Sequence, residues 1–596
     1  MPQTSSDDRP DGRQSLATAA DATGEVAPAA AGPARRYAAW RPWLLWGAAL
    51  LLIGPGLFVL YLLQSRVAPY NSDGASNILQ GQAMLHGNLL LRGWWASDVT
   101  FYTTEVPEYA LVVLFRGLRP DVAHISGALT YTLIVLLGAM LARGRAKGRE
   151  GIIRALLAGG IMLAPSIVGG TPVLLENPDH AGTAVPILAL LLILDRAPER
   201  WYTAVAVCVL LAWTQVADQL TLVAATAPFA AVAVVRLLAL AVRRRPLEEY
   251  RYDALLLVAA GLSTQLAKGA EAALRHFGGI FTHPLPQQLI APAHQIPSNA
   301  RVMGQTILLL FGANTGGKPH VPVDLIARFH LIGLALAGAG LALAIATFFG
   351  KRMDRVSQIL VAGIVATLAA GILGTELPSL AHAHEVAILL PFGAVLAGRM
   401  LPGLLPERWR QGRVVLPAMG VWLACLLAAL CWAASWKPLP PTNQGLASWL
   451  VGHGYKEGLA SYWQANSTTV ASGGQVLVAP ITPQANAARH WEASVSWYDP
   501  SHRRANFVVA AVNPKAVPGG ALSTAVVRKS FGQPAHQYMV GPYVIMVYRY
   551  NLLTKLTNRT FPGYTPAMPP PTGLAAGGAS VGAMQAARSV RDEYGV

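Results

Sequence analysis

The chain has 596 residues, of which 53% are hydrophobic and only 13% are charged. Soluble proteins are about 25% charged, so this composition excludes an ordinary soluble globular protein and predicts a membrane protein. The net charge of +16 comes from short Lys and Arg clusters between apolar runs, which is typical of cytoplasmic loops. No zinc-finger, basic-zipper or RNA-binding signature occurs, so nucleic acid is not an expected partner.

The N-terminal segment 1–34 is rich in Ala, Ser, Asp, Pro and Gly and has no apolar period. It predicts a disordered tail rather than a signal peptide, because no apolar core follows the first residue. Arg35, Arg36 and Arg41 then precede the first apolar run, 43–63, which is long enough to cross about 30 Å of hydrocarbon. Basic residues before a span place the N-terminus in the cytoplasm.

Ten further apolar runs follow, and every even-numbered run ends in a Lys- and Arg-rich cluster. This alternation predicts about eleven transmembrane helices in a multi-pass plasma-membrane domain over 35–436. Its two large external loops are 64–121 and 268–322. The ten runs are 122–142, 152–168, 184–194, 202–215, 220–242, 254–267, 325–349, 359–373, 386–401 and 414–434.

The C-terminal part changes in composition after Trp436. Strand-like runs at QVLVAPI, NFVVAAV, TAVVRKSFG and YVIMVYRYNLL are bounded by Gly, Pro and Asn, which predicts a small external α/β domain over 446–553. The Pro-, Gly- and Ala-rich segment 554–596 is expected to be disordered. The predicted fold class is therefore membrane all-α with a small extracytoplasmic α/β domain. The three cysteines lie in apolar segments and are expected to be buried and unpaired.

The first external loop contains a long polar, aromatic and acidic stretch, 71–107. Asn71 or Asp73 can cap an amphipathic helix expected over GASNILQGQAMLHG, and Asp73 can equally hold a carboxylate at the mouth of a cavity. Glu105 and Glu108 flank Pro107, where they either solvate the interface or act on a substrate. The aromatic residues of this loop, among them Trp94 and Tyr102, are typical of interfacial anchors but can also stack on a sugar.

Other polar residues on the predicted outer face form a second group. Glu176, Asp179 and His180 lie together in ENPDHAGT, where Asp179 can also cap the fourth span. Acids at the ends of membrane helices are costly and tend to line a polar cavity or a substrate path. The outer-face acids also include Asp98, Asp218, Glu376 and Glu385, and the outer-face cations include Arg92, Lys268, Arg275, Arg301 and Lys318.

Charges of both signs suit a phosphorylated substrate, because cations hold the phosphate and a carboxylate acts as a general base. The long external loop also contains His283, His294 and His320, and His382 and His384 have the spacing of metal ligands. A zinc site needs more donors than either pattern supplies. His283 is the candidate metal ligand, and a divalent metal ion is the one candidate cofactor.

These features together resemble the GT-C class of integral membrane glycosyltransferases, which includes aminoarabinose, protein O-mannosyl, and actinobacterial arabinosyl and mannosyl transferases. The resemblance rests on the early acid Asp73, the helix that ends in AMLHGN, and the aromatic stretch WWASDVTFYTTEVPEYALVVLFRGL. It also rests on the second acid Asp179, on the long loop between the seventh and eighth spans, and on the external domain that comes last.

The resemblance implies a polyprenyl-phosphate-sugar donor whose lipid lies in the bilayer, and an envelope glycan, lipid or protein as the acceptor. Asp73 would deprotonate the acceptor hydroxyl, with Asp179 and Glu105 as further catalytic candidates. Arg301, Lys268 or a divalent metal would stabilise the departing phosphate. The remaining substrate-binding candidates are Arg92, Trp94, Tyr102, Glu108 and His180. A single displacement would invert the anomeric centre.

Two other classes of function stay open. A lipid or solute transporter is disfavoured because the sequence shows no inverted repeat and no matched pair of broken helices, and because its acids lie at helix ends. A non-catalytic envelope scaffold of the same fold would have the same composition and topology.

Overall fold

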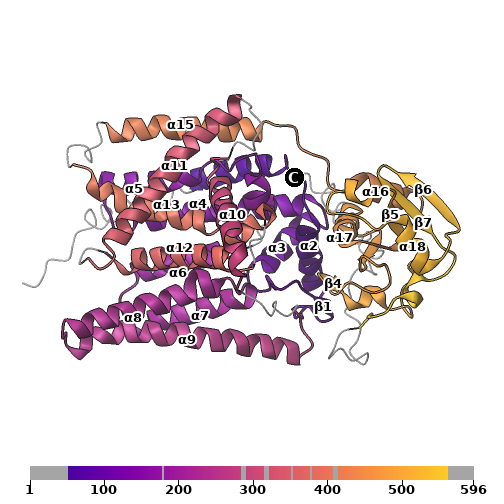
Figure 1. The fold of residues 1–596 in the computed structure, drawn as a ribbon, viewed down its shortest axis with the longest axis horizontal. Helices are drawn as coiled ribbons and strands as arrows, with labels where there is room; N and C mark the ends of the chain where they lie inside the picture. The colour runs from indigo at the N-terminus through magenta and orange to yellow at the C-terminus, as the bar shows by residue number, and fades with distance from the viewer. Residues whose placement is uncertain are drawn as a thin grey trace, which may run out of the picture. The chain divides into compact units, whose positions relative to one another are not determined.

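The computed structural model describes residues 51–176, 180–282, 290–314, 321–350, 353–375, 379–406 and 414–560. Each expected span overlaps a helix. The residues from Gly54 onward form one compact unit. Figure 1 shows these helices gathered on one side of the C-terminal sheet. They are Leu51–Ser65, α4 (Asp121–Arg143), α5 (Gly148–Met162), α6 (Ala184–Arg196), α7 (Trp201–Ala217), α8 (Ala227–Val242), α9 (Leu247–His276), α11 (Val321–Ala346), α12 (Arg355–Leu373), α13 (Leu389–Met400) and α15 (Val415–Ala434).

Five of the described helices are long and apolar enough to cross a membrane: α4, the continuous segment Leu222–Val242, α11, α12 and α15. A sixth results if Leu380–Val386 and Leu389–Leu404, which meet at 51°, form one broken span. The helices Leu51–Ser65 and α7 are apolar but shorter. The chain is therefore a helical membrane protein, while the number of eleven crossings stays a prediction.

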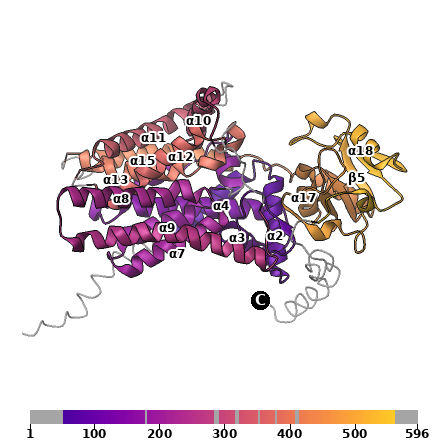
Figure 2. The same ribbon diagram turned by 60° about the horizontal axis from the view of Figure 1, so that its bottom comes forward.

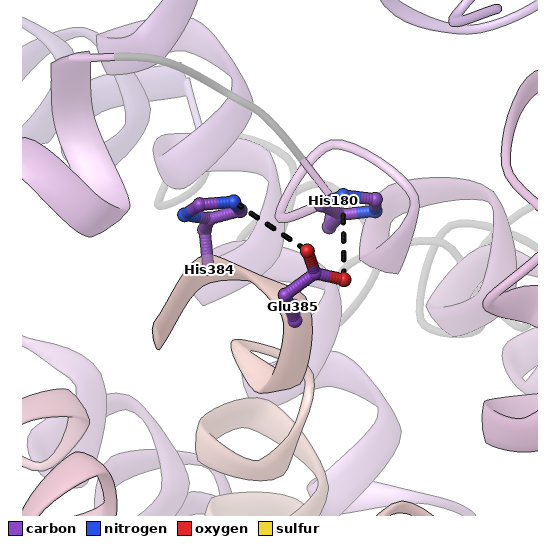
Figure 3. A group of neighbouring side chains, drawn as sticks. All are labelled: His180, His384 and Glu385. Atoms are coloured by element: carbon purple, nitrogen blue, oxygen red, sulfur yellow. Dashed lines mark ion pairs between the residues drawn. The ribbon is translucent and has the colours of Figure 1, made fainter. Parts of the chain in front are cut away.

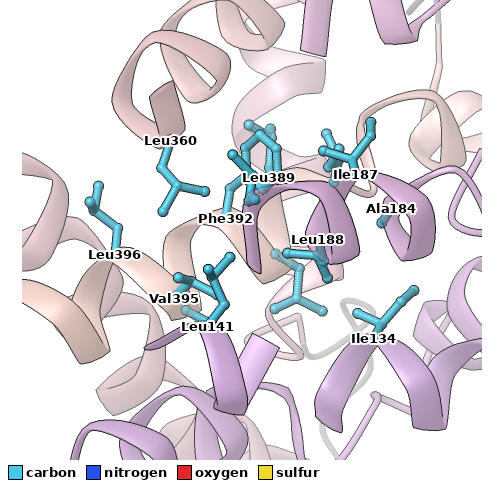
Figure 4. Packing of buried hydrophobic residues seen from close by; sticks show 14 of the residues in the cluster. Ile134, Leu141, Ala184, Ile187, Leu188, Leu360, Leu389, Phe392, Val395 and Leu396 are labelled. Atoms are coloured by element: carbon cyan, nitrogen blue, oxygen red, sulfur yellow. The ribbon is translucent and has the colours of Figure 1, made fainter. Parts of the chain in front are cut away.

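Helix α13 lies at the centre of the membrane part. All of its residues from Leu389 to Arg399 are buried, and Figure 4 shows its Phe392 and Val395 among side chains from α4, α6 and α12. A Cβ at Gly363 of α12 would lie 2.7 Å from the Phe392 ring. Because interiors are close-packed, glycine at this position lets α12 approach α13 closely.

One end of this bundle is held together by ion pairs. Arg399 Nη2 lies 2.7 Å from Asp195 Oδ1 and 3.0 Å from Asp354 Oδ1, and Arg355 Nε lies 3.0 Å from Asp253 Oδ1. These residues lie at helix ends that the charge alternation assigns to the same membrane face. The packing thus agrees with the alternation, and the assignment of that face to the cytoplasm remains a prediction.

The first external loop folds into two helices, α2 (Ser72–Leu85) and α3 (Glu105–Arg116), joined through the short strand β1 (Trp94–Trp95). The helix expected after residue 71 is confirmed. Asn71 is its cap, because Asn71 Oδ1 accepts from the backbone amides of Asp73 and Gly74 at 3.0 Å. A Cβ at Gly81 would lie 2.7 Å from the backbone nitrogen of Ala110, so α2 and α3 are in close contact.

The C-terminal part contains a five-stranded sheet in the order β3-β2-β5-β7-β6. Strand β2 pairs in parallel with β3 and β5, whereas β7 pairs antiparallel with β5 and β6. The elements of this domain are α16 (Gln444–Gly452), β2 (Glu457–Ala460), α17 (Tyr462–Ala471), β3 (Leu477–Pro480), β4 (Ala493–Ser494), β5 (Phe507–Ala511), α18 (Thr524–Phe531), β6 (His536–Val540) and β7 (Tyr543–Val547).

The first external loop and the C-terminal domain share one hydrophobic core. Strand β1 pairs antiparallel with β4, and the Trp94 and Trp497 rings pack edge to face at 5.3 Å. Helix α17 lies beside α2 in both views (Figures 1 and 2), and Ser72 Oγ donates to the carbonyl of Tyr462 at 2.8 Å. The loop is thus an integral part of the external domain.

Two sequence-based expectations are wrong in detail. The run TAVVRKSFG is the helix α18 rather than a strand, because Ser523 Oγ accepts from the Val526 amide at 3.1 Å and caps it. Gly532, at φ 77°, ends the same helix. Of the three free cysteines, Cys208 is buried but Cys431 is exposed.

Candidate functional site

Five titratable side chains meet at the ends of α6 and α13 that lie opposite the Arg399 ion pairs. They come from the first external loop, from the segment before α6, from the end of α7 and from the 3-10 helix η4 (Leu380–Val386) that precedes α13. We call them the outer cluster: Glu105, His180, Asp218, His384 and Glu385.

Asp218 is the fixed centre of this cluster. Its Oδ2 lies 2.9 Å from His180 Nδ1 and accepts from Thr183 Oγ1 at 2.7 Å, and its Oδ1 accepts from the Leu220 amide at 2.8 Å. Burial alone would raise the pKa of Asp218, but the charge of His180 and these hydrogen bonds lower it below the usual value. Asp218 is therefore an ionised carboxylate that orients the His180 ring.

The His180 ring is held by neighbours on several sides. Its backbone has φ 53°, a left-handed conformation that is uncommon for a residue other than glycine. The ring packs edge to face on Phe101 at 5.6 Å and stacks on His384 at 5.6 Å with an angle of 7° between planes. Its Nε2 faces Glu385 Oε2 at 3.7 Å, and His384 Nε2 lies 3.8 Å from Glu385 Oε1 (Figure 3).

Glu105 is the other buried carboxyl of the cluster. It is the first residue of α3 and is 1% exposed. Its Oε2 accepts from the Thr104 hydroxyl, while none of the residues that the structure describes donates to its Oε1. Burial, reinforced by the charges of Asp218 and Glu108, raises the pKa of Glu105 well above its usual value. Paired carboxyls with separated pKa values are typical of acid–base chemistry.

Asp73 contacts the external domain. The Tyr462 hydroxyl forms hydrogen bonds with both Asp73 and Glu492. Since one hydroxyl carries one proton, the two carboxyls can both bind it only if one of them is itself protonated. Burial raises the pKa of Asp73 in spite of the Tyr462 hydrogen bond and the charge of Arg489, which agrees with a shared proton.

Three other predicted residues of the first external loop are held by identified partners. Glu108 accepts from Thr130 Oγ1 at 3.0 Å, and burial raises the pKa of Glu108 to about 7. Trp94 is buried against Trp497, so it anchors the external domain. Tyr102 donates to the Leu89 carbonyl at 3.0 Å.

The predicted phosphate-binding cations Arg92, Lys268 and Arg301 all have exposed side chains, on the segment before β1, on α9 and on α10 (Ile296–Leu310) respectively. Asp179 and His283 lie outside the described residues, as do Lys318, His320 and Glu376.

An apolar groove of about 470 Å³ lies between α7 and α9. The amides of Thr100 and Phe101 donate to the Ala217 carbonyl at 3.1 and 3.0 Å, and Phe101 contacts the His180 ring. Tyr102 and Val216 line the groove. Tyr102 follows Phe101, which contacts the His180 ring, and Val216 precedes Ala217, which accepts the hydrogen bonds from the loop. The other lining residues include Trp213, Leu266, Ala270, Leu274 and Phe277.

The sequence predicts Asp218 and Glu385 as outer-face acids, but it contains no pattern that pairs them with His180. His384 belongs to a His-x-His pattern, and Glu385 follows it directly. The pattern HAHE was the signal available in the sequence. Their contact with each other could not be predicted, because His180 and His384 are far apart in the sequence.

No protein-family model matches the chain, and no curated protein matches it. Among solved structures, the chain is similar to the crystal structure of ArnT from Cupriavidus metallidurans bound to undecaprenyl phosphate. The two are 12% identical over 87% of this chain and 99% of that one, with a TM-score of 0.49. It is also similar to the same protein in the apo state, with 13% identity, the same coverage of both chains and a TM-score of 0.47.

Proposed function

We propose that the chain is an integral membrane glycosyltransferase that moves a sugar from a polyprenyl-phosphate donor to an envelope acceptor on the outer face of the membrane. The observation that carries this proposal is the pair Glu105 and Asp218, two buried carboxyls whose pKa values are shifted in opposite directions. Buried ionisable groups whose pKa values are strongly shifted are concentrated at functional sites, and Asp218 also lies at the end of the apolar helix α7, where acids are expensive.

In this proposal Glu105 removes the proton from the acceptor hydroxyl while the hydroxyl oxygen attacks the anomeric carbon. The bond from that carbon to the phosphate oxygen breaks, and polyprenyl phosphate leaves with the electron pair. A carboxyl with a raised pKa is a stronger base once ionised, so the rate of transfer should rise with pH. A single displacement inverts the anomeric centre.

The groove between α7 and α9 supports a lipid-linked donor. Its described lining is mostly apolar. The lining residue Tyr102 follows Phe101, whose ring packs on His180. An isoprenoid chain in this groove would bring its phosphate to the polar end where His180 and Asp218 lie.

Asp73 is the second candidate for the base, as the resemblance to GT-C enzymes implies. Its carboxyl and that of Glu492 both bind the Tyr462 hydroxyl, whereas Glu105 Oε1 accepts nothing from the described residues. This difference favours Glu105. Leaving a buried polar group such as Glu105 Oε1 without a hydrogen bond costs about 1–3 kcal/mol of stability. A non-catalytic scaffold would gain nothing in return for this cost.

The proposal is tested in a strain that lacks the chain, by analysis of its envelope glycans and lipids. We expect one sugar to be missing from the envelope of this strain and to return when the wild-type chain is reintroduced. The variant Glu249→Gln, which changes an exposed residue paired with Arg245, should restore the sugar equally well. Glu105→Gln should insert normally and fail to restore the sugar. An envelope that is unchanged without the chain would favour the scaffold, and full restoration by Glu105→Gln would reject the assigned base.

A further inference from the structure

We infer that His180, His384 and Glu385 form a binding site for a zinc-type divalent cation within the outer cluster. The inference rests on the geometry of these three residues, and only the role given to the cation rests on the proposed function.

The three donors are already close to the arrangement that a metal requires. One ligand atom from each residue lies within 4.8 Å of the other two, and Glu385 lies between the two imidazoles (Figure 3). Tetrahedral zinc binds imidazole nitrogen at about 2.0–2.1 Å, which places neighbouring ligand atoms about 3.4 Å apart. The nitrogen–oxygen distances of 3.7 and 3.8 Å run to the two different oxygens of Glu385, so a bound cation would draw the three donors closer together.

Asp218 gives His180 the orientation of a metal ligand. A ligating histidine usually donates its second ring N–H to a carboxylate, and His180 Nδ1 lies 2.9 Å from Asp218 Oδ2. Thr183 and the Leu220 amide hold that carboxylate in turn. In the neutral ring with its proton on Nδ1, the Nε2 lone pair faces Glu385 Oε2 at 3.7 Å. A cation can replace the second ring proton at this position.

The donor set selects the class of cation. Magnesium and calcium prefer all-oxygen sites, whereas two imidazoles and one carboxylate suit zinc or a similar transition metal. Three protein ligands leave a fourth position open, as in zinc sites that bind a substrate. If the proposed function holds, that position would take an oxygen of the donor phosphate.

The test uses the full chain in lipid nanodiscs, purified with a tag that contains no histidine and stripped with a chelator. Equilibrium dialysis against Zn²⁺ should give one bound ion per chain, with no competition from excess Mg²⁺. His384→Ala should weaken zinc binding at least 100-fold, and Asp218→Asn by about 10–100-fold. His382→Ala is the matched control, because His382 stacks on His384 and contacts Ser379 but is not one of the three donors.

Thermal unfolding without metal shows whether each variant folds, and His384→Gln replaces His384→Ala if the alanine variant does not. Equal zinc affinity in wild type and in the His384 variant would overturn the site. A second proton on the His180 ring would then explain why Nε2 faces Glu385. An equal loss in His382→Ala would also overturn it. Zinc is titrated without any sugar donor, so bound zinc without sugar transfer would reject only the proposed function. Transfer by a chain that binds no zinc would reject only the cation site.

Discussion

His180 Nδ1 and Asp218 Oδ2 lie 2.9 Å apart although 38 positions separate them in the sequence. Both side chains are largely buried, with 10% and 0% of their surfaces exposed. This contact joins the segment before α6 to the end of α7. It makes the outer cluster a structured site, because it fixes one imidazole against which Glu385, His384 and Phe101 are arranged.

Replacing Asp218 by Asn should lower the stability of the chain at neutral pH by about 1–3 kcal/mol, because a buried, fully hydrogen-bonded carboxylate is lost. The pKa of Asp218 is lowered in the folded state, so its contribution is complete above the ordinary carboxyl pKa and disappears as the pH falls through the lowered value. The difference in Tm between wild type and variant should shrink accordingly in acid.

The exposed pair of Asp499 and His502, with 2.7 Å between its Oδ2 and Nδ1, is the matched control for Asp218→Asn. Asp499→Asn should cost less than about 1 kcal/mol, as exposed ion pairs do. Equal losses for the two variants would show that burial of the His180 contact adds nothing.

Gly182→Ala should disturb the outer cluster directly. A Cβ at Gly182 would overlap the Glu105 carboxyl, whereas one at Gly304 of α10 would meet nothing within 4 Å. We expect Gly182→Ala to reduce sugar transfer at least tenfold and to lower Tm, because overpacking a buried site costs about 1–3 kcal/mol. Gly304→Ala should leave both unchanged. Full activity in Gly182→Ala would mean that Glu105 can move without consequence.

The contact between Asp73 and Tyr462 separates two roles for Asp73. If Asp73 chiefly ties α2 to α17, Tyr462→Phe and Asp73→Ala should reduce transfer to a similar extent, because each removes the hydrogen bond between Asp73 and Tyr462. If Asp73 is the base, Asp73→Ala should abolish transfer and Tyr462→Phe should keep a measurable rate. Transfer assays on membranes of matched protein content distinguish the two, and our assignment of Glu105 predicts similar reductions.

Glu108 should make stability depend on pH near neutrality. Burial raises its pKa from 4.5 to about 7, so the folded state favours the protonated form. The destabilisation from ionising Glu108 begins as the pH rises above 4.5 and is complete above about 7. Glu108→Gln should therefore raise Tm by a few degrees at pH 8 and have little effect at pH 4, while Glu249→Gln should not. A Tm gain of the same size at both pH values would contradict the raised pKa.

The ion pairs at the opposite end of the bundle should be structural. Arg399→Met leaves Asp195 buried without its partner, and breaking a buried pair costs about 3–5 kcal/mol. Arg245→Met, which removes an exposed pair with Glu249, should cost less than about 1 kcal/mol. Denaturation of both variants in detergent gives the comparison. Similar costs would show that the Arg399 contacts are solvent-screened.

Much of the fold follows from local patterns in the sequence. Each predicted apolar run overlaps a helix, and Asn71 before an amphipathic stretch located α2. Helix α18 was wrongly predicted as a strand because Val526 and Val527 favour strands. The Ser523 cap and the packing of Val527 and Phe531 in the core override that preference. The pairing of β1 with β4 could not be predicted, because it joins two short segments that are far apart in the chain.

The candidate site was predictable only in its parts. Placing Asp218, Glu385 and His180 on one face required only the order of the spans. Their contacts depend on how α6, α7 and α13 pack, and no periodicity in the sequence encodes that packing. The pKa of Glu105 depends likewise on its burial against Gly182 and on the charge of Asp218. Neither influence can be inferred from the motif TTEVPE.

The most direct test of the proposed site is the release of polyprenyl phosphate from a polyprenyl-phosphate sugar in proteoliposomes supplied with envelope extract as the acceptor. Wild type and Glu249→Gln should release it at the same rate, and that rate should rise with pH as Glu105 ionises. Glu105→Gln should fall to the background of empty liposomes at every pH. Release by Glu105→Gln at the wild-type rate would contradict the assignment of catalysis to the outer cluster.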